Sequence, residues 1–137
     1  MHDDRSRIRE AAHETIQRYE REEEQATVQL LMARAGHGGL AVLAQQETLA
    51  AVNMAQVHKL VMHKDFRSDS WCCAGCSYIG EGPTPSQCAV CGGQATTTEL
   101  GEAMVQAVLQ TDSWVELVAP DARLGAYDGV GTLLRHK

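Results

Sequence analysis

Apolar residues recur at the spacing of an α-helix near the start of the chain, at Ile8, Ala12, Ile16 and Tyr19 and again at Ala26, Leu30, Leu31 and Ala33. Steps of three and four residues bring side chains to one face of a helix, so this pattern predicts a helix from Asp3 to about Ala35. Gly36 is expected to end that helix. The charged stretch Tyr19–Gln25 between the two apolar groups is interpreted as a solvated face, with a docking surface as the alternative.

From Gly38 onward, short apolar runs that suit buried strands alternate with segments of helical spacing. The expected strands are 39–43, 57–62, 114–118 and 130–134, and the expected helices cover 46–54 and 100–109. This alternation predicts an α/β fold, a layered α/β/α domain around a mixed, largely parallel sheet. The expected core residues are Leu40, Val42, Leu49, Val52, Leu60, Val61, Val105, Leu109, Val115 and Leu117.

Between the second strand and the next helix, four cysteines form two matched pairs, Cys73 with Cys76 and Cys88 with Cys91. Each C-x-x-C step places two sulfurs on one tight turn, where following backbone N–H groups point at the thiolates. Two glycines and two prolines lie between the pairs and favour a reversal of the chain. The spacing therefore predicts one tetrahedral site in which all four sulfurs bind a single metal ion.

Zinc is the metal that four cysteines at this spacing indicate most strongly. Four protein ligands leave no open position for water, so the zinc is expected to stabilise structure and not to do chemistry. Iron is the alternative, because residues 76–83 resemble the first turn of rubredoxin-type domains, whose four-thiolate iron carries electrons. Cys72 is interpreted as an inert strand residue, although a C-x-x-x-C step from Cys72 to Cys76 leaves it as an alternative ligand.

The composition is that of an ordinary globular domain, with 44% hydrophobic and 22% charged residues in a chain of 137. The sequence shows no signal peptide and no apolar run long enough for a bilayer, so we expect a cytoplasmic location and no membrane partner. The formal net charge is −6, and an acidic domain is poorly suited to neutralising nucleic-acid phosphates. Composition therefore argues against direct RNA binding.

Several short motifs follow one another in a recognisable order. They are Gly38–Val42 (GGLAV), Glu47–Val52 (ETLAAV), Val57–Val61 (VHKLV) with Asp65–Arg67 (DFR), the two cysteine pairs, and Gly129–Arg135 (GVGTLLR). Together they resemble the C-terminal domain, the third domain, of archaeal and eukaryotic class 1 peptide chain release factors. Bacterial relatives of these factors and the ribosome-rescue protein Pelota share this domain. The resemblance extends from about Ile16 to the C-terminus.

This resemblance implies a fold like that of the kink-turn-binding ribosomal proteins. It divides the chain into an N-terminal helical linker at 1–36 and an α/β domain at 37–137, with an inserted zinc ribbon at 69–97. In that family the domain is non-catalytic and contacts a translational GTPase or the ribosome, while stop-codon reading and peptidyl-tRNA hydrolysis belong to two preceding domains. The chain is therefore expected to be a C-terminal fragment, with those preceding domains as partners, or a shortened relative.

Two short motifs suggest other functions. The tripeptide Gly92–Gln94 spells the GGQ by which release factors place a glutamine at the peptidyl-transferase centre, but here it follows Cys91, where zinc-binding turns commonly have glycine. Kink-turn binders carry Asn-Glu and then Lys at the start of the helix after their first strand; here Gln46–Glu47 occupies that place and Ala50 replaces the lysine. We therefore expect no peptide hydrolysis and interpret the chain as a protein-interaction domain, with an RNA-binding module of kink-turn type as an alternative beside the rubredoxin-like electron carrier.

Overall fold

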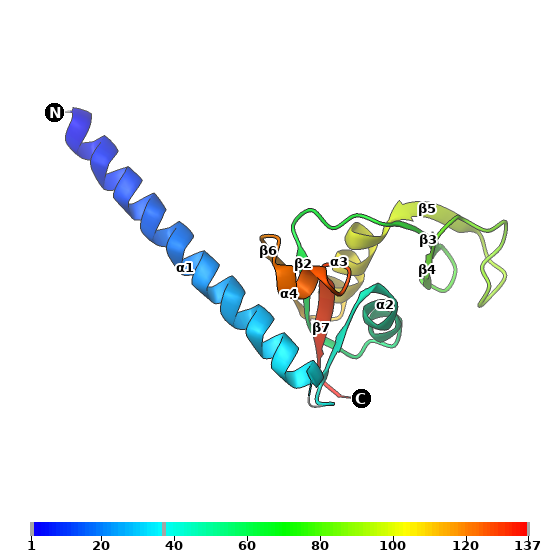
Figure 1. Cartoon of the computed structure of the whole chain (residues 1–137). Coiled ribbons are helices and arrows are strands. Elements are labelled where there is room, and N and C mark those ends of the chain that lie inside the picture. The colour runs from blue at the N-terminus through cyan, green and yellow to red at the C-terminus, as the bar shows by residue number, and fades with distance from the viewer. Residues whose placement is uncertain (1, 37, 137) are drawn as a thin grey trace.

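The computed structural model describes residues 2–36 and 38–136, and within these ranges the side chains of residue 18 and of residues from 20 onward. The helices are α1 (His2–Gly36), α2 (Gln45–Asn53), α3 (Leu100–Gln110) and α4 (Ala122–Gly125). The strands are β1 (Ala41–Leu43), β2 (Val57–His63), β3 (Asp69–Cys73), β4 (Ile79–Glu81), β5 (Ala95–Glu99), β6 (Trp114–Val118) and β7 (Val130–Leu134). Figure 1 shows a layered body from which α1 and the β3–β5 segment project on opposite sides.

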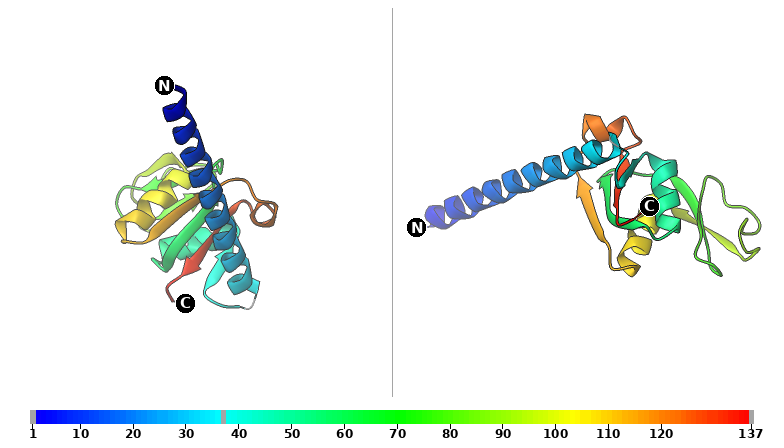
Figure 2. Two further views of the ribbon diagram at one scale, coloured as in Figure 1. Left: turned by 90° about the vertical axis from the view of Figure 1, so that its left-hand side faces the viewer. Right: turned by 90° about the horizontal axis from the view of Figure 1, so that it is seen from below.

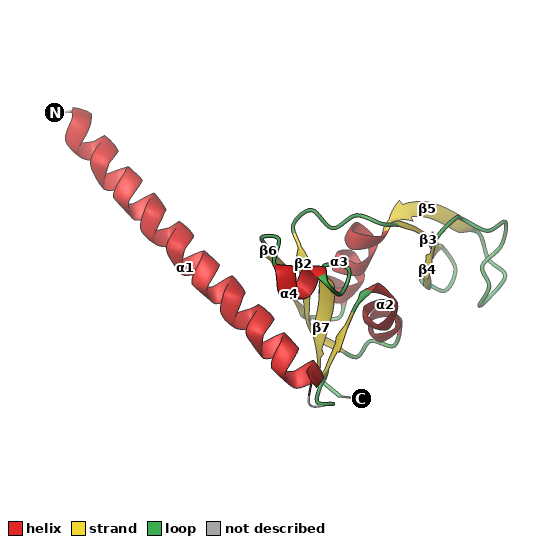
Figure 3. Ribbon diagram, viewed as in Figure 1, coloured by secondary structure: helices red, strands yellow, loops and turns green. Residues whose placement is uncertain are grey.

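The helices and strands expected from the sequence are confirmed. The strands at 114–118 and 130–134 correspond residue for residue to β6 and β7, and the others differ by two residues or fewer at either end (Figure 3). Helix α1 ends at Gly36, as expected. The chain then turns because Gly38 adopts a positive φ of 64°, while the backbone N–H of Gly39 donates to the carbonyl of Arg34 at 2.7 Å.

The main sheet has four strands in the order β1-β7-β2-β6 and is mixed, as predicted. Strands β2 and β6 are parallel, with Lys59 opposite Trp114. Strand β7 lies between β1 and β2 and runs antiparallel to both. The expectation of a largely parallel sheet is therefore wrong, because the last strand of the chain enters the middle of the sheet in the opposite direction to its neighbours.

Helices cover both faces of this sheet, which confirms the α/β/α layers (Figure 2). On one face α2 and α3 pack against β2 and β7, and the buried residues there include Leu49, Leu60 and Met104. On the other face the end of α1 and the short α4 pack around Leu31, Val61 and Leu124. Each face of the sheet therefore has its own apolar core.

Seven of the ten expected core residues are buried or half-buried, and three are not. Leu117 is 46% exposed because β6 is an edge strand. Leu109 is 56% exposed, since the buried face of α3 consists of Leu100, Met104 and Val108 at steps of four residues. Leu40, at 39% exposure, precedes β1 and lies outside its paired residues.

The buried face of α1 agrees with the expected one at Leu31 and differs at the other described positions. Val28 and Leu31 are buried against the sheet, whereas Ala26, Leu30 and Ala33 are exposed. The two sets lie on different sides of the helix, because they are offset by one or two residues in a period of 3.6. The remaining expected positions on this face, Ile8, Ala12, Ile16 and Tyr19, lie outside the described side chains.

Between β2 and α3 the chain forms a second, smaller sheet in the order β4-β3-β5. Both pairings are antiparallel. The ring of Trp71 on β3 lies directly against the backbone of Gly80 on β4, where an added Cβ would come within 2.1 Å of the ring. Trp71 also lies beside Tyr78, with 5.6 Å between ring centroids. This three-stranded sheet, with the turns that follow β3 and precede β5, is called the ribbon below.

Candidate metal centre

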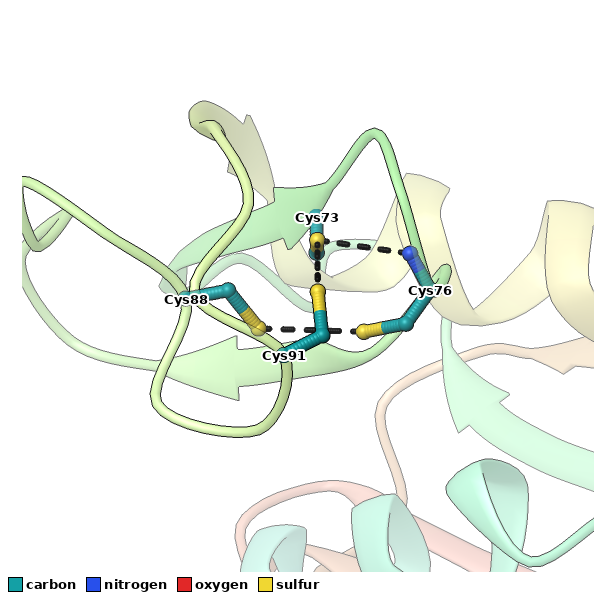
Figure 4. Close-up of side chains that lie close together, drawn as sticks. All are labelled: Cys73, Cys76, Cys88 and Cys91. Carbon is teal, nitrogen blue, oxygen red and sulfur yellow. Dashed lines mark hydrogen bonds between the residues drawn. The ribbon is translucent and has the colours of Figure 1, made fainter.

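The ribbon brings the four predicted cysteines together at one end (Figure 4). Cys73 ends β3 and Cys76 follows in the next turn, while Cys88 and Cys91 come from the turn before β5. Their four sulfur atoms all lie within 4.8 Å of one another. The Sγ atoms of Cys73 and Cys91 are 3.4 Å apart, and those of Cys76 and Cys88 are 3.7 Å apart.

These distances fit a shared metal ion and not a disulfide. A disulfide holds its sulfurs about 2.05 Å apart, and the cysteines here are free thiols. Four sulfurs placed tetrahedrally about 2.3 Å from a zinc ion would be separated by about 3.8 Å. The observed separations of 3.4 and 3.7 Å are close to that value.

Backbone N–H groups point at the sulfurs in both turns. Within the first turn, the N–H groups of Gly75 and Cys76 donate to the Sγ of Cys73 at 3.3 and 3.4 Å. In the second turn, the N–H of Val90 donates to the Sγ of Cys88 at 3.3 Å. The N–H of Gly93 donates to the Sγ of Cys91 at 3.4 Å. Such donors stabilise negative charge on sulfur, which is the form of cysteine that binds metals.

The pKa values of two cysteines in the cluster are shifted in opposite directions. The pKa of Cys73 is lowered to about 6, chiefly because the backbone N–H of Cys76 donates to its sulfur. For Cys76, a backbone hydrogen bond from Tyr78 lowers the pKa, but burial and the other three thiols outweigh it and raise the pKa to about 12. Four thiols this close cannot all ionise alone, and a bound divalent cation removes that conflict.

Cys72 lies outside this group. Neighbouring residues of a strand point to opposite sides, so Cys72 is directed away from the cluster that its neighbour Cys73 joins. Its side chain is half-buried against the core formed by α2 and α3, and its Sγ approaches the carbonyl of Cys73 at 3.9 Å. This placement agrees with its interpretation as a strand residue.

The GGQ tripeptide is part of the second cysteine turn. Gly92 has a positive φ of 76° and its N–H donates to the carbonyl of Cys88 at 2.9 Å. Gly93 lies so close to the cluster that a Cβ there would be 3.2 Å from the sulfurs of Cys73 and Cys91. Gln94 is exposed, and its carbonyl accepts a hydrogen bond from the other turn. The two glycines therefore have a local structural explanation.

One side chain that the sequence did not single out attaches the ribbon to the body. Asn53, at the end of α2, donates from Nδ2 to the carbonyl of Ile79 at 2.9 Å and accepts from the N–H of Ile79 at 3.0 Å. Ile79 is itself part of the core formed with α2 and α3. Glu99 forms a second junction, because its carboxylate accepts hydrogen bonds from Ser68 and from the first turn of α3.

The segments considered for RNA binding lie elsewhere on the body. Gln46–Glu47 and Ala50 are exposed on α2. Of the basic side chains on β2 and just after it, Lys59 lies 3.5 Å from Glu116 and Lys64 lies 3.7 Å from Glu24. Both lysines therefore already face carboxylates of the same chain.

Comparison with solved structures identifies the class of fold. The chain is similar to the C-terminal domain of a peptide chain release factor from Methanosarcina mazei, with a TM-score of 0.73 over 100% of this chain and 96% of that one. Sequence identity is 18%, so the likeness establishes the fold. The resemblance seen in the sequence is confirmed at that level, and the chain has the fold of a release-factor C-terminal domain. No family model matches the chain, and no curated protein sequence matches it.

The described helices contain no candidate for a membrane span. Over residues 2–36 and 38–136, none combines the necessary length with the necessary apolar character. The longest, α1, carries a dense run of charges at 20–24.

Proposed function

We propose that this chain is a non-catalytic protein-interaction domain of a release-factor-like protein in translation termination or ribosome rescue, working in the cytoplasm and stabilised by structural zinc. The observation that carries the proposal is the fold, which matches a release-factor C-terminal domain over the full chain. Its partners would be a translational GTPase, the ribosome, or other domains of a longer factor.

The cysteine cluster supports the zinc assignment. Cys73, Cys76, Cys88 and Cys91 supply a complete set of four ligands, which leaves no position for a reacting water. Zinc bound there would join the two turns of the ribbon and neutralise the charge on four thiolates. Such a metal holds the ribbon together and takes no part in catalysis.

Metal analysis tests this assignment directly. We expect about one zinc ion per chain, retained by Cys72→Ser and lost from Cys88→Ser, because only the second change removes a ligand. A strong chelator should unfold the ribbon before the body, since bound zinc contributes about 10 kcal/mol or more to the folding of such sites. Visible absorption from bound iron in freshly purified protein would instead support a rubredoxin-like electron carrier.

Binding measurements test the role in translation. We expect the purified chain to bind a translational GTPase or ribosomes in titrations, more tightly than it binds a kink-turn RNA. The acidic charge and the pairing of Lys59 and Lys64 with carboxylates support this order. Tight RNA binding at physiological salt, abolished by replacing Lys59, Lys64 and Arg67 with alanine, would show that the proposal is wrong.

A further inference from the structure

Strand β6 is an open edge of the main sheet. It lies last in the order β1-β7-β2-β6 and pairs with β2 on one side only. The opposite edge, β1, has three residues against five in β6. An edge strand presents unpaired N–H and C=O groups, and proteins commonly protect such edges with proline or a covering element. Strand β6 contains no proline.

Large apolar side chains are exposed along this edge. Trp114 is 65% exposed and Leu117 is 46% exposed, and both belong to β6. Leu109, at 56%, lies on α3, the helix that contacts β6. Exposed apolar groups gathered beside an open strand are typical of surfaces that bind another chain.

The two faces of β6 are directed to different surroundings. Val115 packs against the core of α2 and α3, whereas Val118 belongs to the core of α1 and α4. Because side chains of a strand alternate between its faces, Leu117 is directed to the α3 side, and Trp114 and Glu116 are directed to the α1 side. A strand added next to β6 would place its own side chains alternately on these two sides.

The α3 side offers a recess whose exposed surface is mainly apolar, with the charged side chains of Lys64, Arg67, Glu99 and Glu102 also in its lining. A cavity of about 330 Å³ lies beside Leu117, and Met62, Phe66 and Val105 contribute its apolar lining. Leu117 forms part of this wall at the sheet edge, and Val105 forms part of it on α3. An apolar side chain of an added strand would cover this exposed apolar surface and remove it from solvent.

The α1 side is acidic. A smaller cavity of about 170 Å³ between α1 and β6 is lined by the carboxylates of Glu20, Glu23, Glu24 and Glu116, with Lys64 and Leu117. Among the described residues, the buried Oε2 of Glu116 accepts no hydrogen bond. Lys59 also lies 3.5 Å from Glu116, so the four carboxylates face two lysines, and this excess of negative charge favours a cationic side chain from a partner.

We propose that β6 is the interaction edge of this domain and that a protein partner adds an extended segment to it, with apolar side chains alternating with Lys or Arg. The backbone of that segment would pair with β6, its apolar side chains would enter the α3-side recess, and its cations would meet the glutamates on the α1 side. This inference rests on the proposed role as a protein-interaction domain, and it names the surface and the chemistry of the partner.

A synthetic peptide of alternating valine and lysine is the probe. Trp114 is the reporter, because it is exposed while Trp71 is buried, so an added quencher reaches Trp114 first. We expect the peptide to shield Trp114 from the quencher, with an affinity that falls as the salt concentration rises. A peptide with glutamate in place of lysine should not bind. N-methylation of every second residue removes alternate backbone donors, so of the two possible N-methylated peptides, the one that is methylated on the residues whose N–H groups face β6 should not bind either.

Variants of the protein locate the site. Leu117→Lys should weaken peptide binding about tenfold, because it removes an apolar contact and adds a like charge. Met54→Lys is the matched control, since Met54 is 65% exposed at the end of α2, away from β6. Exchanging Glu20 and Glu23 together for lysine should transfer the preference from the lysine peptide to the glutamate peptide.

Several outcomes would overturn the inference: no binding of the valine-lysine peptide, binding that survives both N-methylated registers, or equal affinities for Leu117→Lys and Met54→Lys. A translation partner that binds the unchanged chain and Leu117→Lys equally would refute the β6 site and leave the proposed function intact. Binding of the peptide at β6 by a chain with no affinity for any translation partner would refute the proposed function and leave the β6 site intact.

Discussion

Replacing Asn53 with alanine should weaken the attachment of the ribbon to the body. The Asn53 side chain makes two hydrogen bonds to the backbone of Ile79, at 2.9 and 3.0 Å, and Ile79 is only 3% exposed. Alanine leaves a buried N–H and a buried C=O without partners, and each such group costs about 1–2 kcal/mol. The free energy of unfolding should therefore fall by about 2–4 kcal/mol, a large fraction of a typical domain stability of about 5–15 kcal/mol.

Urea unfolding of the zinc-loaded protein, followed by circular dichroism, measures this change. Gln45→Ala is the matched control, because the Gln45 amide also links α2 to β4, through a 2.7 Å hydrogen bond to Glu81, but on the exposed surface. We expect that control to change stability by no more than about 0.5 kcal/mol. Equal effects of the two substitutions would refute the reasoning, since burial of the Ile79 backbone is the only feature invoked to distinguish them.

Three further predictions follow from the ribbon and from the connection before α4. Gly80→Ala should cost about 2–3 kcal/mol in urea unfolding and alter the near-ultraviolet dichroism of Trp71, because the new methyl group would overlap its ring. Gln94→Ala should leave thermal stability unchanged, and a peptide-release assay should detect no activity in either protein, because this exposed side chain belongs to a cysteine turn; release that depends on Gln94 would contradict this. Hydrogen bonds from the Arg123 side chain lower the pKa of Asp121 from 3.8 to about 2; the carboxylate therefore stabilises the fold above pH 3.8, and its contribution is lost as the pH falls through about 2. Asp121→Asn should lower the free energy of unfolding by about 1 kcal/mol at neutral pH. Acid titration of the unchanged protein should remove the same stabilisation.

The sequence predicted the features that depend on local spacing. The apolar runs at β6 and β7 are bounded by turn-forming residues, so their limits could be read directly. The cysteine pairs likewise specify two turns, and the fold needs only to bring these turns together. Glu99 had a readable signal as well, since an acidic residue directly precedes the helical stripe that begins at Leu100.

Features set by distant contacts could not be read in the same way. The direction of β7 depends on how it inserts between β1 and β2, and its apolar residues suit a parallel or an antiparallel pairing equally. The buried face of α1 was predicted correctly at Leu31 but not at Ala26, Leu30 or Ala33, because alanine and leucine occur on two sides of the helix and only packing on the sheet selects one. Asn53 gave no periodic signal, because its partner Ile79 is 26 residues away.

Helix α1 gives the domain the mechanics of a lever. It begins to face the body at Glu20 and Glu23, which line the cavity beside β6. Glu24 then accepts a hydrogen bond from the backbone N–H of Ala119, and Val28 and Leu31 pack in the core. The 18 residues from 2 to 19 extend beyond that base (Figure 1), a length of about 27 Å at about 1.5 Å per residue, so a 10° tilt at the base would move the helix at residue 2 by about 5 Å. A loss of packing too small to unfold the domain would therefore be amplified into a large displacement at the tip.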